Sequence, residues 1–371
     1  VNSGVMIDVL NANLTLKAND PGAIPANRSA GNALISLNGS SLKAGTGTID
    51  ISMGNGSTSG NISITGSSLT KAANIVVNHN GTAGAGIDLS SAIIDTDGGQ
   101  QSSGSLVVAA NQGGITASSS SLILRGNDGN TVTMRSRDDI SLSSNTINRV
   151  GSASTIGATG LYAGKSVSLS GGLDLMLADS PLTIRANYYD ANAGVDSVRA
   201  VGTATISTGY AFNGIRSTNS NISLKIMDGS GLTGATPTSG DITIARVSST
   251  SGAANNLEII NNGPTAGGKV IINGAISVLG TVNIATQNGN INLGGNISTT
   301  NTTAGAITLT AGSASLAPTS TGGDIGISNT RTLTTGTGGS VYLFSGSSSA
   351  STGLAALATA SVPIMLEAPG L

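Results

Sequence analysis

Short runs in which apolar and polar residues alternate recur along the whole chain, and each is bounded by Gly, Asn, Asp or Ser. In the stretch 289–309, Ile291 and Leu293 alternate with Asn, and a glycine pair leads to a shorter run at Ile297. The same phrase restarts at Gly305. Apolar residues at every second position are typical of half-buried β-strands, and helical spacing is sustained nowhere. The chain is therefore predicted to be all-β.

The apolar runs fall into a stronger and a weaker class. The stronger runs predict strands over residues 34–37, 49–51, 62–64, 75–77, 87–89, 106–108, 122–124, 132–134, 140–142, 167–169, 173–175, 222–224, 242–244, 270–272, 282–284, 291–293, 307–309 and 325–327. The weaker runs have the form Ser-Ser-Leu or Gly-Ala-Ile, as at residues 40–42, 67–69, 92–94 and 274–278. A strong run, a weak run and a corner take roughly 20–25 residues, a period that indicates a β-solenoid.

Such a solenoid depends on stacking, because each coil buries its apolar residues only against its neighbours. With strands ~4.8 Å apart, about 16 coils would form a rod on the order of 75 Å long. Apolar residues should point inward, Gly should turn the corners, and Asn, Ser and Thr should point outward. In the stretch 289–309 the expected inward residues are Ile291, Leu293, Ile297, Ile307 and Leu309.

We expect one solenoid domain over residues 1–371, with two departures from the pattern. Residues 187–219 hold four of the seven aromatic residues and little strand signal, so an excursion from the rod is expected there. Residues 346–371 are rich in Ala and Ser and are expected to form a transition segment. Because the chain begins inside the pattern, we expect it to be a piece of a longer protein.

Composition supports a narrow aliphatic core. Hydrophobic residues make up 38% of the chain, aromatic residues 2% and charged residues 9%, with 54 Gly. Regularly placed Ile, Val and Leu argue against a disordered linker of the same composition. The net charge of -2 argues against a nucleic-acid partner, and no apolar run reaches the ~18 residues of a transmembrane helix. Without cysteine the chain has no disulfide or thiolate metal site.

Candidate metal or cofactor ligands are sparse, and no cofactor is expected. His79 is the single histidine; it lies beside Gly81, where we expect a solvated corner side chain. The segment that begins with Asp95 and Asp97 starts like a calcium-binding loop, but it lacks the acidic residue at the end of such a loop.

The densest group of charges predicts either surface ion pairs or the start of an enzyme site. Paired charges on adjacent coils are the simpler interpretation, whereas β-helical polysaccharide lyases and hydrolases use similar residues in catalysis. The group consists of Arg125, Asp128, Arg135, Arg137, Asp138 and Asp139.

An aromatic and arginine group inside the predicted excursion is the candidate contact surface. Aromatic residues and Arg are enriched at binding hot spots, although a small local core under an irregular loop would use the same residues. The group consists of Tyr188, Tyr189, Arg199, Tyr210, Phe212 and Arg216.

The recurring Gly-Asn/Asp-Ile-x-Ile phrases, at residues 60–64, 240–244, 289–293 and 323–327, resemble the shafts of large secreted bacterial adhesins. These are of the filamentous haemagglutinin type, exported by the two-partner route, and also include autotransporter shafts. The resemblance implies a right-handed parallel β-helix at the bacterial cell surface or secreted from it. It further implies a role in adhesion, biofilm or delivery, with an outer-membrane transporter for secretion.

These observations predict a non-enzymatic structural and adhesive rod. Its expected partners are host or neighbouring-cell surfaces, glycans or matrix polysaccharide, and other copies of the rod. Two alternatives remain open at this stage: a β-helical carbohydrate-active enzyme, and the stalk of a contact-dependent toxin.

Overall fold

The computed structural model of the chain describes residues 1–20, 33–54, 60–81, 86–96, 104–125, 131–144, 146–150, 157–188, 203–209, 211–233, 239–251, 255–263, 268–287, 289–312, 323–328, 330–345, 351–353 and 364–367. Within these ranges the regular elements are β-strands throughout, and no helix occurs. Accordingly, the described part of the chain holds no helix long and apolar enough to cross a membrane.

The strands form three parallel sheets, named A, B and C below, and each strand pairs with the strands three before and three after it. Sheet A consists of β1 (Met6–Asp8), β4 (Ser41–Lys43), β7 (Ser68–Thr70), β10 (Ile93–Asp95), β13 (Ser121–Arg125), β16 (Thr146–Val150), β19 (Asp174–Met176), β22 (Gly214–Ser217), β25 (Val247–Ser249), β28 (Ile276–Val278), β31 (Ile297–Thr299) and β34 (Leu333–Thr334).

Sheet B is the longest of the three. It consists of β2 (Leu14–Ala18), β5 (Thr48–Met53), β8 (Asn74–His79), β11 (Ser105–Ala110), β14 (Val132–Ser136), β17 (Thr159–Ala163), β20 (Leu182–Ala186), β23 (Ile222–Ile226), β26 (Leu257–Asn261), β29 (Val282–Thr286), β32 (Ile307–Ala311), β35 (Val341–Ser345) and β36 (Ile364–Glu367).

Sheet C completes each turn of the chain. It consists of β3 (Ala33–Asn38), β6 (Gly60–Thr65), β9 (Gly86–Asp88), β12 (Gly114–Ser118), β15 (Ile140–Ser143), β18 (Val167–Ser170), β21 (Ala204–Thr208), β24 (Ser239–Ile244), β27 (Val270–Ile272), β30 (Ile291–Leu293) and β33 (Ile325–Ile327).

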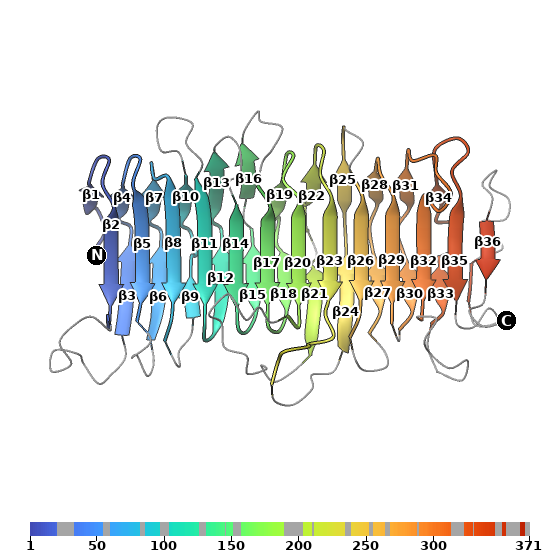
Figure 1. The fold of residues 1–371 in the computed structure, drawn as a ribbon, viewed down its shortest axis with the longest axis horizontal. Coiled ribbons are helices and arrows are strands. Elements are labelled where there is room, and N and C mark those ends of the chain that lie inside the picture. The colour runs from blue at the N-terminus through green and yellow to red at the C-terminus, as the bar shows by residue number, and fades with distance from the viewer. Residues whose placement is uncertain are drawn as a thin grey trace.

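One turn of the chain contributes one strand to each sheet, so the molecule is a parallel β-helix, as predicted. Figure 1 shows the strands stacked along the long axis, with β1 and β36 at opposite ends of the rod. Most weak runs form sheet A and most strong runs form sheets B and C. A coil therefore has three strands, where the sequence pattern indicated two.

Coil length varies more than the predicted repeat of roughly 20–25 residues. In sheet B, Thr159 pairs with Leu182, 23 residues later, whereas Leu182 pairs with Ile222, 40 residues later. Longer coils absorb their extra residues mainly between strands, because the strands stay paired in parallel, with a register shift between β21 and β24 at Ala204–Ile206. Within the described residues the sheets contain 12, 13 and 11 strands, which gives fewer coils than the estimate of about 16.

Alternation of side chains fills the interior with aliphatic residues. The inward residues expected in the stretch 289–309 are confirmed, because Ile291, Ile297, Ile307 and Leu309 are 0% exposed and Leu293 is 1% exposed. They belong to a core cluster of Ile, Leu, Val, Ala and Met that includes residues from Leu14 to Leu343. Burial of each large aliphatic side chain contributes about 1.5–3 kcal/mol, which stabilises the stack of coils.

Polar residues enter the interior where several sheet B strands end. His79, Ser136 and Asn261 each occupy the last position of their strand and are buried. Each donates a hydrogen bond to a glycine carbonyl near a sheet C strand: Gly60 (3.0 Å), Gly113 (3.0 Å) and Gly240 (2.9 Å). These bonds give each of the three buried polar side chains a hydrogen-bond partner.

The expectation that His79 is solvated is wrong. His79 is 0% exposed because it continues the inward alternation of Ile75 and Val77 along β8. Its register partners in the neighbouring coils are Met53 and Ala110, which are also buried.

The two predicted departures are only partly described. Inside 187–219 the chain forms β21 and β22, which take regular places in sheets C and A, and residues 189–202 and 210 lie outside the described residues. Inside 346–371, β36 pairs with β35, and Thr352 forms an isolated parallel bridge to Gly326. The rest of that segment also lies outside the described residues.

Candidate functional site

The residues of the predicted contact surface have different structural roles. Tyr189, Arg199 and Tyr210 lie outside the described residues. Phe212 is 7% exposed and belongs to the aliphatic core, so it is a packing residue just before β22. Arg216 projects outward from β22 of sheet A and forms an ion pair with Asp174 on the preceding coil.

Tyr188 lies on a different side of the rod. It directly follows β20 of sheet B, and its backbone N–H bonds to the carbonyl of Ala163 at the end of β17 (3.1 Å). Its ring is 5.4 Å from the ring of Tyr162, centroid to centroid. Tyr188 is therefore part of a cluster with Tyr162, a residue that the sequence analysis did not select.

Local pairing occupies two described members of the charge group, Arg137 and Asp139. Asp139 accepts a hydrogen bond from the backbone of Ser166 (3.1 Å) and faces Lys165 (3.4 Å) on the next coil. Arg137 donates to the side chain of Gln112, on the preceding coil. Asp128 and the side chain of Arg125 lie outside the described part of the structure. Arg137 and Asp139 thus pair between adjacent coils.

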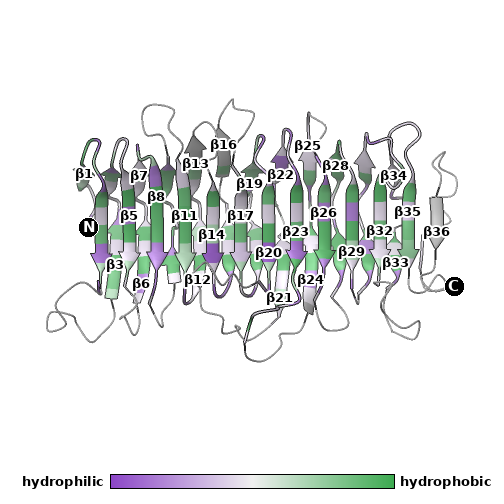
Figure 2. Ribbon diagram, in the orientation of Figure 1, coloured by the Kyte–Doolittle hydropathy of each residue, from purple (hydrophilic) through white to green (hydrophobic). Residues whose placement is uncertain are grey.

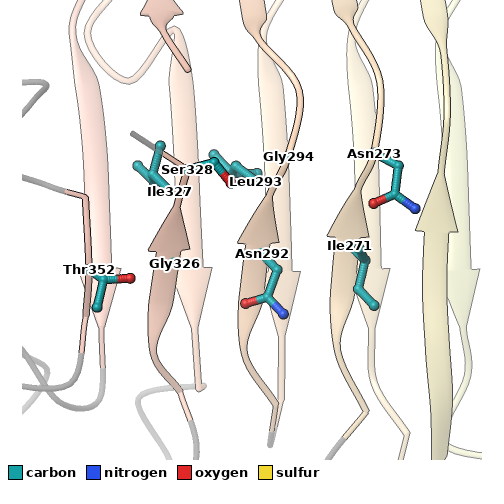
Figure 3. Close-up of a pocket in the computed structure, with 9 residues that line it drawn as sticks. All are labelled: Ile271, Asn273, Asn292, Leu293, Gly294, Gly326, Ile327, Ser328 and Thr352. Atoms are coloured by element: carbon teal, nitrogen blue, oxygen red, sulfur yellow. The ribbon is translucent and has the colours of Figure 1, made fainter. Parts of the chain in front are cut away.

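A groove lies on the outward face of sheet C toward the C-terminal end (Figure 3). Its floor is a row of register partners on successive coils, Ile271, Asn292, Gly326 and Thr352. Its volume is about 610 Å³, and the remaining lining residues are Asn273, Leu293, Gly294, Ile327 and Ser328. Gly326 leaves the space open, since a Cβ there would lie 3.3 Å from Asn292 Oδ1 and 3.6 Å from Thr352 Oγ1.

The chemistry of this groove is neutral. Amide and hydroxyl groups of Asn273, Asn292, Ser328 and Thr352 line it together with the apolar Ile271, and none of the described lining residues is charged. Groups of this kind form hydrogen bonds with a polar ligand but transfer no protons near neutral pH. Elsewhere among the described residues, no group of three or more His, Asp or Glu side chains is placed to hold a metal ion.

The second candidate surface is a row of side chains on the outward face of sheet B, which we call the Arg–Tyr row. Arg135, Tyr162, Arg185 and Lys225 are register partners on four consecutive strands, β14, β17, β20 and β23. The guanidinium carbon of Arg135 lies 5.4 Å from the Tyr162 ring centroid, a cation–π distance. Figure 2 shows hydrophilic bands toward the arrowheads of β14, β20 and β23.

Gly160 determines how the Tyr162 ring lies on the sheet. Both residues face outward from β17, and a Cβ on Gly160 would lie 2.3 Å from Cε2 of the ring. The ring therefore lies along the strand above the glycine instead of standing away from the sheet. The absence of a side chain at position 160 is what allows this orientation.

A hydrogen-bonded network fixes the far end of the row. Arg185 donates to the Ser223 carbonyl (3.1 Å) and hydroxyl (3.2 Å), and Ser223 donates to Glu258 (2.8 Å). Lys225 forms an ion pair with the same Glu258 oxygen (2.8 Å). Burial lowers the pKa of Arg185, against the opposing influence of Glu258, Tyr162 and Tyr188.

The pKa of Glu258 follows from the same contacts. Burial acts to raise it, but hydrogen bonds from Lys225 and Ser223, together with the charges of Lys225 and Arg185, outweigh burial and place the pKa below its ordinary value. Glu258 is therefore ionised near neutral pH. The network joins two cations of the row, Arg185 and Lys225, to a single carboxylate, and Arg135 lies at the Tyr162 end of the row.

A signal for the Arg–Tyr row was present in the sequence. The phrases Val-Thr-Met-Arg, Thr-Gly-Leu-Tyr, Leu-Thr-Ile-Arg and Ile-Ser-Leu-Lys carry the four residues at the same outward position. Aligning these phrases would have revealed the row, whereas a search for local density selected residues 187–219. Comparisons with protein families, with curated proteins and with solved structures find no match to this chain.

Proposed function

We propose that this chain is a structural and adhesive rod of a secreted bacterial surface protein, without enzymatic activity. The observation that carries the proposal is the continuity of the stack. Sheet B extends through 13 strands with parallel pairing at each step, around one aliphatic core. A rod of this kind holds contact surfaces away from a cell.

Side chains reinforce the backbone pairing between coils. The amide oxygen of Asn13 accepts from the backbone N–H of Thr48 (2.9 Å) on the next coil, and that of Asn256 accepts from Thr281 (2.8 Å). Asn290 accepts from both Gly323 and Asp324 (3.0 Å each). Bonds parallel to the rod axis resist bending and leave few backbone groups open to proteases, as an extracellular filament requires.

Outward surfaces support a role in contact and not in chemistry. The sheet C groove offers neutral amide and hydroxyl groups, and Arg137 and Asp139 of the charge group are engaged in pairing between coils. Such surfaces suit a host or neighbouring-cell surface, a matrix polysaccharide or a second rod. The proposal includes export through an outer-membrane transporter to the cell surface or medium.

An adhesion assay with coated beads tests the proposal. Beads carrying the folded chain should attach to bacterial or host cells and to biofilm matrix. The control chain carries Ile184→Asp and Ile259→Asp, which place carboxylates in the core and prevent stacking. Equal attachment of folded and control chains would contradict the adhesive role, and release of sugar fragments from a polysaccharide by the folded chain would contradict the non-enzymatic role.

A further inference from the structure

We propose that the Arg–Tyr row is a binding site for an acidic sugar, a carboxylate-bearing residue of a polysaccharide such as a uronate. The proposal deepens the proposed function by naming a ligand class for the rod, and it rests on that function for the ligand's extracellular setting. The site consists of Arg135, Tyr162, Arg185 and Lys225, with Tyr188 beside it.

The row is linear and parallel to the rod axis. Its four residues occupy the same strand position on consecutive coils, so neighbouring side chains are ~4.8 Å apart at the backbone and the row is about 14 Å long. A linear polysaccharide lying along the rod would present successive sugar rings to successive coils. This arrangement suits a polymer better than a compact ligand.

Tyr162 provides a stacking platform. Its ring lies along the sheet above Gly160, and the Tyr188 ring is tilted 38° to it at a centroid distance of 5.4 Å. The apolar C–H face of a pyranose packs on an aromatic face of this kind, while its hydroxyl groups stay in water. Two tilted rings beside a cationic row therefore offer aromatic surface for one sugar.

Charge at the site favours a carboxylate ligand. Arg185 and Lys225 bring two positive charges to a network with one carboxylate, Glu258, and Arg135 adds a cation beside the Tyr162 ring, although the whole chain has a net charge of -2. The hydrogen bonds of Arg185 to Ile184 and Ser223 use three of its five N–H donors. Two donors remain for a ligand oxygen, held by a guanidinium that is already oriented.

A single-stranded nucleic acid also combines stacking bases with anionic phosphates. The row has three cations on four coils and one pair of rings, whereas nucleic-acid sites track many phosphates along a continuous basic groove. The short, weakly charged platform therefore favours the sugar. An oligonucleotide is included in the test as the competing outcome.

Titration calorimetry with an oligogalacturonate tests the site. The purified chain should bind the oligogalacturonate and bind a galactose oligomer of equal length at least about tenfold more weakly. Tyr162→Leu and Lys225→Gln should each weaken oligogalacturonate binding about tenfold or more. Tyr342→Leu is the matched control, since Tyr342 lies on the same sheet face, beside Phe344, and should leave binding unchanged.

Gly160→Ala provides an independent variant. It adds one methyl group that displaces the Tyr162 ring while every charge remains, so it should also weaken binding. Circular dichroism and the melting temperature establish that each variant is folded. Unchanged binding in folded Tyr162→Leu and Gly160→Ala overturns the site.

Two other results would also overturn the proposal. Equal binding of dextran sulfate and oligogalacturonate would show attraction to any polyanion, and tighter binding of a single-stranded oligonucleotide would assign the row to a different ligand. If oligogalacturonate binding is absent while coated beads still adhere to cells, the sugar site is wrong and the adhesive rod stands. Failure of adhesion with sugar binding intact gives the opposite assignment.

Discussion

Two parts of sheet B have similar inward residues and different outward ones. In β14, β17, β20 and β23 the outward row is Arg, Tyr, Arg and Lys, whereas in β29 and β32 the same row carries Ala285 and Thr310. The inward residues of both parts are buried aliphatic side chains such as Leu161 and Leu309. The comparison shows that the interior specifies the coil and leaves the outward positions available for binding chemistry.

The largest expected loss of stability comes from substitutions in the interior, and it should be equal in the two parts of sheet B. Leu161→Ala and Leu309→Ala should each lower the free energy of unfolding by about 2–5 kcal/mol, since both leucines are 0% exposed. Denaturant unfolding and hydrogen exchange of the adjacent coils measure the loss. A difference of more than about 1 kcal/mol between the variants would show that the outward row contributes to coil stability.

Close contacts between coils at the corners give the next largest effect. A Cβ on Gly164 would lie 2.1 Å from the Arg137 carbonyl oxygen, and one on Gly295 would lie 1.9 Å from that of Gly274. Gly164→Ala and Gly295→Ala should therefore each destabilise the rod by about 1–3 kcal/mol. Gly338→Ala is a less crowded comparison, because no atom lies near its added Cβ, although its φ of 86° adds backbone strain. Similar melting temperatures for all three variants would contradict steric control of coil spacing.

Acid should distinguish the two parts of sheet B. The pKa of Glu258 is below its ordinary value of 4.5, so its contribution to stability is complete above that value and is lost as the pH falls through the folded-state pKa. Hydrogen exchange in β23 and β26 should therefore accelerate at low pH more than in β29 and β32. In Glu258→Gln this additional acid sensitivity should disappear, and its persistence would assign the effect to another group.

The smallest effect on stability is expected from transplanting the row. Ala285→Arg, Thr308→Gly, Thr310→Tyr and Phe344→Arg reproduce the Arg135–Tyr162–Arg185 arrangement on β29, β32 and β35. Each surface change should alter the free energy of unfolding by no more than about 0.5 kcal/mol, apart from the added glycine. The variant should gain a second oligogalacturonate site, detected as increased stoichiometry. Unchanged stoichiometry in a folded variant would mean that the row needs more of its surroundings.

Local alternation was sufficient to predict much of the fold. It identified the strand class and the inward residues of the stretch 289–309, because the side chains of a strand alternate regardless of what surrounds it. The same alternation also indicates that His79 is buried, because His79 follows Ile75 and Val77 at every second position. His79 was expected to be solvated because its residue type and the nearby glycine were given more weight than its place in the strand alternation.

Local alternation alone does not predict features that depend on pairing between residues far apart in the sequence. Sheet A has short strands such as β4, so the third side of the coil gave little apolar signal. The Arg–Tyr row joins residues 27, 23 and 40 positions apart, and no fixed period connects them. Phe212 was expected in a contact surface because it is aromatic, but the coil buries it. Sheet A, the Arg–Tyr row and the burial of Phe212 all depend on how coils of unequal length stack on one another.

Hydrogen bonds that run parallel to the rod axis determine how the rod responds to pulling. A force applied at the two ends loads one terminal coil at a time, because each coil is joined only to its neighbours. Releasing a coil of 23 to 40 residues would lengthen the chain by roughly 80 to 140 Å, in place of a ~4.8 Å rise. The stack of coils is therefore expected to lengthen in steps under tension, each step releasing one coil and dissipating part of the applied work.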